Sequence, residues 1–144
     1  MSLIIYPMCK NEINSVKKLD QQSSVVWPRQ YYIKSLNTNN FFAFLAQIDK
    51  QYAGSIMFRL INTNLNIDKI VVKKEYRHQG IGTKLLKKAI GIGKKKKANK
   101  VLLTVSHGNI YAIDFYTKHG FVFESIQWFH YVDYEHGIKM YRRI

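Results

Sequence analysis

The sequence predicts a single α+β domain in which short strands and short helices follow one another along the chain. Several short apolar or alternating runs have the residue types of strands. Other segments repeat apolar residues at the spacing of a helix. A chain of 144 residues is large enough to bury one core, and linkers or repeats do not interrupt it. We therefore expect one domain over residues 1–144.

The first half of the chain predicts one strand, two helices, a hairpin and a further strand. Pro28 can occupy the first turn of the second helix because proline is tolerated there. The polar turn Asp49-Lys50-Gln51 separates the two apolar runs of the hairpin. In chain order, the expected elements are Met1–Met8, 11–19, 28–36, 41–48, 52–61 and 64–72.

The second half predicts two helices and three strands. Leu85, Leu86 and Ala89 recur at helical spacing after a glycine-containing loop. Gly91 and Gly93 each weaken this helix by about 1 kcal/mol relative to alanine, so we expect it to end within the lysine run that follows. The later elements are a strand at 101–105, a helix at 109–118 that stops at His119-Gly120, and strands at 121–131 and 137–142.

The composition predicts a well-packed cytoplasmic protein with a basic surface. Lys and Arg number 23 against 9 Asp and Glu, for a net charge of +14, which favours polyanions such as RNA or a phosphorylated cofactor. Apolar runs are too short for a membrane span, and the first residues lack the pattern of a signal peptide. Cys9 is the single cysteine, so an intramolecular disulfide is excluded. The scattered histidines do not predict a metal site.

The stretch EYRHQGIGTKLLKKAI, residues 75–90, places two glycines in front of a helix. The first turn of a helix has unpaired N–H groups and a partial positive charge, so it binds phosphate. Glycines allow positive φ and a close approach of the ligand to the backbone. The spacing differs from that of a P-loop, and Leu85 stands where a dinucleotide fingerprint needs a third glycine.

Two motifs resemble the signature of the GNAT superfamily of N-acetyltransferases. The first is R-x-x-G-x-G at Arg77, Gly80 and Gly82, which follows the strand Ile70-Val71-Val72. The second is NIYAIDFYTKHGF, residues 109–121, which is similar to the N-x-x-A-x-x-[LF]-Y-x-x-x-G-F segment of that superfamily. The Trp-Pro before a helix, the hairpin and the tail HYVDYEHGIKMYRRI are most similar to the ribosomal-protein alanine N-acetyltransferase group.

This resemblance implies a mixed, mostly antiparallel sheet of about seven strands, helices on both faces, and a splay between the fourth and fifth strands. It also implies acetyl-CoA as the acetyl donor, with no metal. The strand before the loop would pair with the pantetheine arm, and the loop would hold the pyrophosphate. The implied cofactor-binding residues are Ile70, Val71, Val72, Arg77, His78, Gln79, Gly80, Ile81, Gly82, Thr83, Asn109 and Tyr116.

The resemblance assigns a general acid but leaves the base open. Tyr116 occupies the position of the family's acid for the CoA thiolate, and a phenol is protonated at neutral pH. The alanine N-acetyltransferase group carries a glutamate where this chain has Thr104, and threonine is not a general base. Asp68, which shares strand parity with Ile70 and Val72, is the first substitute. Further substitutes are His107, Glu124 and a chain of water molecules.

The acceptor pocket is expected at the variable edges of the fold. Candidate acceptor-binding residues are Trp27, Tyr31, Phe58, Thr104, Phe129 and Tyr131. Aromatic side chains with few acids suit a peptide N-terminus, so the expected reaction is acetylation of a protein N-terminal amine, with a ribosomal protein as one acceptor. The alternatives are acetylation of a small amine or lysine side chain, and a degenerate fold that binds RNA or ribosomes.

Overall fold

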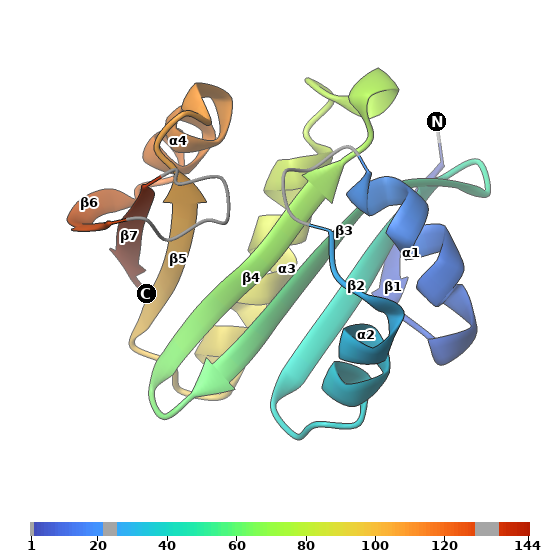
Figure 1. Cartoon of the computed structure of the whole chain (residues 1–144), viewed down its shortest axis with the longest axis horizontal. Helices are drawn as coiled ribbons and strands as arrows, with labels where there is room; N and C mark the ends of the chain where they lie inside the picture. The colour runs from blue at the N-terminus through green and yellow to red at the C-terminus, as the bar shows by residue number, and fades with distance from the viewer. Residues whose placement is uncertain (1, 22–25, 129–135) are drawn as a thin grey trace.

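The computed structural model describes residues 2–21, 26–128 and 136–144. These residues form one seven-stranded sheet with the order β1-β2-β3-β4-β5-β7-β6. Helices cover both faces (Figure 1). The strands are β1 (Leu3–Pro7), β2 (Phe41–Ile48), β3 (Gln51–Ile61), β4 (Asn64–Val72), β5 (Lys100–Ser106), β6 (Val122–Gln127) and β7 (Gly137–Arg143). The helices are α1 (Ile13–Asp20), α2 (Arg29–Leu36), α3 (Ile81–Lys95) and α4 (Ile110–Lys118), with 3₁₀ turns at Lys10–Glu12 and Lys74–Tyr76.

The predicted α+β class and mostly antiparallel sheet are confirmed. The β4 bounds agree with the prediction, and α3 ends at Lys95, inside the lysine run as expected. Gly120 follows α4 with φ +86°, the left-handed conformation expected at a helix end. Several bounds differ by one or two residues: α1 begins at Ile13, Gln51 belongs to β3 and not to the turn, and Pro28 is the N-cap of α2, just before its first turn. The end of the predicted strand 121–131 lies outside the described residues.

The splay between the fourth and fifth strands is also confirmed. All neighbouring strands pair antiparallel except β4 and β5, which are parallel. The β4–β5 register joins Asn64–Ile67 to Lys100–Leu103 and ends there. Beyond that point the two strands diverge (Figure 1). The last residues of β4 therefore have no strand partner on the β5 side, within the described part of the chain.

A β-bulge interrupts β4 where it leaves β5. Met57 of β3 pairs with Lys69, but the adjacent Phe58 pairs with Ile67, so Asp68 is the extra residue. Ile70 and Val72 pack in the cluster that includes α3, whereas Asp68 bonds to Arg59 on the opposite side of the sheet. The expectation that Asp68 shares a face with Ile70 and Val72 is therefore wrong, because the bulge changes the alternation.

The two faces of the sheet carry separate hydrophobic clusters. On the α3 face, α3 and α4 pack against strands through residues such as Phe58, Leu86 and Tyr116. On the α1–α2 face, Ile13 and Tyr32 pack against Met57 and neighbouring strand residues. This arrangement leaves the splay between two helical layers.

A buried ion pair joins α1 to β4 next to the bulge. Lys69 Nζ lies 3.0 Å from Asp20 Oδ2, and the side chains are 4% and 0% exposed. The Lys69 ammonium also lies 4.8 Å from the centroid of the Trp27 ring. Burial raises the pKa of the Asp20 carboxyl and lowers that of the Lys69 ammonium, because a low-dielectric site disfavours both charges. The partner charge opposes each shift.

We expect Lys69→Met to destabilise the domain by about 3–5 kcal/mol, because it leaves Asp20 as an unpaired buried charge. The double variant Asp20→Leu/Lys69→Met should recover most of this loss, since replacing a whole buried pair by apolar groups is often neutral. Urea denaturation of the three proteins measures both effects. A double variant no more stable than the single one would show that the pair does not act through charge.

Candidate functional site

The loop between β4 and α3 has the backbone geometry of an anion cradle. Gly80 is the N-cap of α3 with φ +81°, and His78 has φ +63°. A Cβ built on Gly80 would meet no atom within 4 Å, so the space beside it is open. Neither the cap nor the first turn of α3 carries an acidic side chain. The N–H groups at the start of α3 can therefore donate hydrogen bonds to a phosphate.

Arg77 connects this loop to the end of β4. Its Nε donates to the carbonyl oxygen of Val72 at 3.0 Å, and its side chain is exposed. The N–H of Lys73 donates to the carbonyl of Ala53 at 2.8 Å. These bonds hold the start of the loop against β3 and β4, so the cradle lies at the open end of the splay.

Helix α4 packs against the start of α3. A Cβ on Gly82 would lie 3.3 Å from the Phe115 ring, so glycine permits this close approach. Tyr116 is 5% exposed, and its ring contacts those of Phe115 and Phe121. The predicted acid, Tyr116, thus lies on α4, and the predicted phosphate loop leads into α3, the helix on which α4 packs.

His119 is a positioning residue that the sequence analysis missed. Its Nδ1 lies 2.7 Å from the carbonyl of Phe115, and its Nε2 lies 2.9 Å from Thr83 Oγ1. Because a carbonyl only accepts, Nδ1 carries a proton. This bridge joins the end of α4 to the first turn of α3. The sequence indicated only that His119-Gly120 stops a helix, and the bridge depends on a packing that no local pattern shows.

Asn109 is the N-cap of α4. Its side-chain oxygen accepts from the N–H of Ala112 at 3.2 Å. Such a bond satisfies one of the free donors of a helix start. The predicted contact of Asn109 with the pantetheine arm is an additional role that these contacts do not test.

The candidate bases lie in three different places. Asp68 is 12% exposed, and both its oxygens accept from Arg59 at 2.7 Å. His107 follows β5, and its Nδ1 lies 3.1 Å from the backbone N and O of His136. Glu124 lies on β6, beyond β5 and β7, where it pairs with Lys139 at 3.3 Å. Of the two carboxylates, Asp68 is thus the one next to the start of the splay.

Thr104 lies on the α1–α2 face of β5. Leu103 and Val105, its neighbours, pack in the cluster on the α3 face, and strand alternation directs Thr104 to the other side. Asp68 bonds to Arg59 on that same side. The two residues therefore border the splay on the face that also carries the acceptor candidate Trp27.

The aromatic residues predicted to bind the acceptor differ in their exposure to solvent. Trp27 contacts Tyr31 at a ring-centroid distance of 4.5 Å, and Tyr31 is 44% exposed, so both can line an acceptor site. Phe58 is fully buried on the α3 face, stacked on Phe42 and Phe44. Its assignment to the acceptor site is wrong, because no part of it reaches the surface. The candidates Phe129 and Tyr131 lie outside the described residues.

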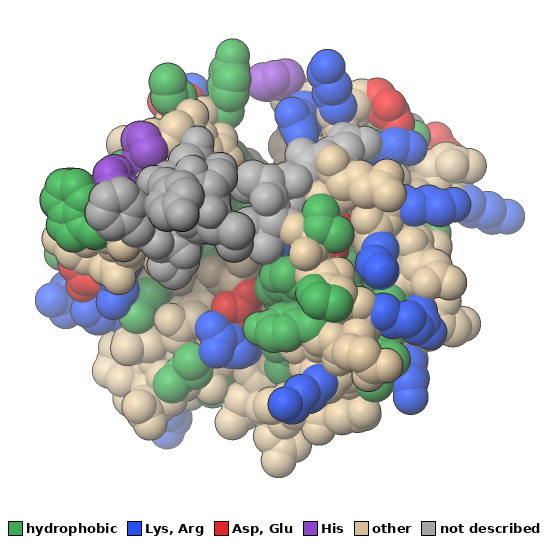
Figure 2. All heavy atoms as spheres, in the orientation of Figure 1, with side chains coloured by type: hydrophobic (Ala, Val, Ile, Leu, Met, Phe, Trp, Pro, Cys, Tyr) green, Lys and Arg blue, Asp and Glu red, His purple; other side chains and the backbone are tan. Residues whose placement is uncertain are grey.

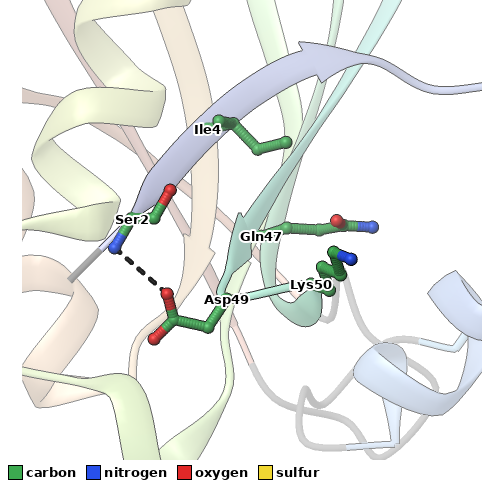
Figure 3. A pocket seen from close by; sticks show the side chains of 5 residues that line it. All are labelled: Ser2, Ile4, Gln47, Asp49 and Lys50. Carbon is green, nitrogen blue, oxygen red and sulfur yellow. Dashed lines mark hydrogen bonds between the residues drawn. The ribbon is translucent and has the colours of Figure 1, made fainter.

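Figure 2 shows the α1–α2 face, on which Lys and Arg side chains are scattered and few acids are visible. A hollow of about 480 Å³ lies elsewhere, at the β1 edge, lined by Ser2, Ile4, Gln47, Asp49 and Lys50 (Figure 3). The Ser2 N–H donates to Asp49 there at 3.3 Å. Because β1 and the splay are separated by β2 and β3, this hollow is not part of the candidate site.

Within residues 2–21, 26–128 and 136–144, no group of three or more His, Cys, Asp or Glu side chains could hold a metal ion. In the same ranges, no helix is both long and apolar enough to cross a membrane.

Two curated proteins of Bacillus subtilis are similar in sequence. Streptothricin acetyltransferase A is 36% identical over 88 residues, which are 58% of this chain and 49% of that protein. The match therefore spans about half the length of this relative. The second protein has the provisional name [ribosomal protein bS18]-alanine N-acetyltransferase. It is 27% identical over 124 residues, which are 85% of this chain and 82% of that protein.

Solved structures share the fold over nearly the whole chain. The ribosomal-protein-S18-alanine N-acetyltransferase from Escherichia coli has a TM-score of 0.89 at 20% identity and covers 99% of this chain and 94% of its own. The NatC complex bound to Gag peptide and CoA contains a chain with a TM-score of 0.87 at 21% identity, covering 100% of this chain and 99% of that one. The Acetyltransferase (GNAT) family profile matches residues 13–121. Together with the splayed strands and the glycine loop, this match shows that the chain belongs to the GNAT family of acetyltransferases.

Proposed function

We propose that this GNAT enzyme transfers an acetyl group from acetyl-CoA to the α-amine of a protein N-terminus, with a ribosomal protein as the acceptor. The observation that carries the proposal is the splay beside β4, with an open phosphate cradle at its end. A strand edge next to a cradle suits a ligand that has both an amide-containing arm and a pyrophosphate. A ribosomal acceptor would place the reaction in the cytoplasm.

The residues present fit acetyl-CoA, which supplies an activated acetyl thioester. The backbone of Ile70–Val72 would pair with the pantetheine arm, because this part of β4 has no partner strand on the β5 side among the described residues. The N–H groups of residues 78–83 would hold the pyrophosphate, and Arg77 would position that loop. Asn109 would contact the arm from the start of α4.

Three chain groups would act on the reaction. The N–H of Val72 would polarise the thioester carbonyl, as an oxyanion-hole donor does. Tyr116 would protonate the departing thiolate, and α4 holds it in place through the His119 bridge. Asp68 would take the proton of the amine only if Arg59 moves aside, because Arg59 occupies both carboxylate oxygens. His107 or water molecules would be the alternative path.

Two observations support other acceptors or roles. The 36% identity to streptothricin acetyltransferase A favours a small amine as the runner-up acceptor, although that match covers 58% of this chain. Thr104, which stands where the ribosomal group has a glutamate, is the feature that favours a binding protein without turnover. Aromatic side chains at Trp27 and Tyr31 support the peptide acceptor.

The acceptor is tested by CoA release from acetyl-CoA across a panel of amines. The panel contains alanine- and serine-starting peptides, an N-terminally blocked lysine peptide, spermidine, an aminoglycoside and streptothricin. We expect turnover with the free N-terminal peptides alone. Turnover confined to streptothricin or another small amine would overturn the peptide assignment, and acetyl-CoA binding without any turnover would support the binding role.

We expect Gly80→Val to weaken CoA binding by at least about tenfold, because a β-branched residue at φ +81° is strained and distorts the cradle. Isothermal titration with CoA measures the change. Gly91→Ala is the matched control, since Gly91 also has open space around it but has no positive φ. Equal CoA affinity in the two variants would remove the loop from the binding site.

We expect Tyr116→Phe to lower kcat by about 10²-fold or more, in the range of general acid catalysis, with CoA affinity nearly unchanged. Tyr111→Phe on the same helix is the control, because Tyr111 is 89% exposed. Steady-state kinetics and CoA titration separate the two readouts. Unchanged kcat in Tyr116→Phe would leave Tyr116 as a core residue only.

A further inference from the structure

A row of exposed lysines runs along α3. The proposed acetyl transfer assigns no role to these lysines. Residues three or four apart on a helix lie on one side, so the first five of these lysines share one side of α3, and the last two follow its final residue. Exposed Gly91 lies on the same side. At 1.5 Å per residue, the helical part is about 16 Å long. We call these residues the α3 lysine row: Lys84, Lys87, Lys88, Lys94, Lys95, Lys96 and Lys97.

The segment of sequence that carries the row contains no acidic residue. The sequence contains no Asp or Glu between Glu75 and Asp114. The ion pairs of the described residues involve none of the row. Lys88 and Lys96 lie over the rings of Phe44 and Phe42, at 5.2 and 5.6 Å, so these two also have a packing role. The others present uncompensated charge to solvent.

Local helix energetics do not account for the whole row. Lys94 and Lys95 lie at the negative end of the α3 dipole, which they stabilise. Lys84 and Lys87 lie near the positive end and are like charges three residues apart, which destabilises a helix. The first half of the row therefore destabilises α3, and a bound anion would reduce this repulsion between like charges.

The chemistry of the row indicates which polyanion fits. Interfaces with proteins concentrate binding energy in buried aromatic and other apolar residues, whereas every exposed residue of α3 is a lysine or Gly91. Single-stranded nucleic acid is held in large part by bases stacked on aromatic rings. No exposed residue of α3 is aromatic, and the rings of Phe42 and Phe44 lie under lysines of the row. A regular series of cations suits the continuous phosphates of a double helix.

We propose that the α3 lysine row binds the phosphate backbone of duplex RNA without reading its sequence. The choice of RNA over DNA rests on the proposed ribosomal acceptor. The row lies on α3, behind the sheet in Figure 1, whereas α2, which carries the acceptor candidate Tyr31, lies on the opposite face. An RNA-bound acceptor would thus meet the enzyme on two surfaces.

The test measures binding of a fluorescein-labelled 16-base-pair RNA duplex by anisotropy, across a range of salt concentrations. The variant Lys87→Gln/Lys94→Gln/Lys95→Gln removes three row charges and leaves Lys84, beside the cradle, intact. Its matched control is Lys10→Gln/Lys34→Gln/Lys50→Gln, which removes three exposed lysines elsewhere. We expect at least about tenfold weaker binding for the row variant at 0.1 M salt, and a salt slope smaller by two to three, because each lost phosphate contact contributes about 0.9.

Equal losses in the two variants would overturn the proposal, since net charge alone would then explain binding. Tighter binding to a DNA duplex or to polyglutamate than to RNA would overturn the choice of partner. Saturating CoA should leave RNA affinity unchanged, and competition would instead place RNA in the cradle. The row variant should acetylate a short peptide at the same rate as the native chain. The RNA-binding proposal can therefore be wrong while the proposed acetyl transfer is right.

Discussion

The end of the β4–β5 pairing is the constraint on which the candidate site depends. The register stops at Ile67, and the bulge in β4 places its extra residue at Asp68, the next position. Bulges bend a strand and increase its local twist. The bulge therefore accounts for the divergence of β4 from β5. Backbone groups on the diverging strand edge need partners, which makes this edge receptive to an extended ligand.

Two ion pairs hold the bulge from the α1–α2 face. Arg59 bonds to both oxygens of Asp68, and the buried Asp20 bonds to Lys69. Each pair joins a residue of β4 to a different element: Asp68 to β3 and Lys69 to α1. The side chains of Asp68 and Lys69 are therefore both held on the α1–α2 face of the sheet. A buried pair is expensive in desolvation and is weak evidence for stability. Its value here is geometric, because it fixes where β4 turns away from β5.

Local pattern was enough to predict most of the fold and the glycine-containing loop before α3. The alternation of residues 64–72 fixed the extent of β4, and the positive φ of Gly80 agrees with the glycine requirement of the loop. The bulge was not predictable, because it depends on the register with β3. Phe58 was misassigned for a related reason: alternation separates the two faces of a strand but does not identify which face borders an acceptor site. His119 needed the packing of α4 on α3.

Charge is distributed unevenly, and this links the two proposed binding surfaces. The segment between Glu75 and Asp114 contains the phosphate loop, all of α3 and the start of α4, and it has no acid. A region of one sign raises the local concentration of anions, including a phosphorylated cofactor. The cradle gains directional N–H donors from its backbone, whereas the α3 lysine row offers only mobile charges. The same field would therefore attract both ligands, and backbone geometry would decide which one enters the splay.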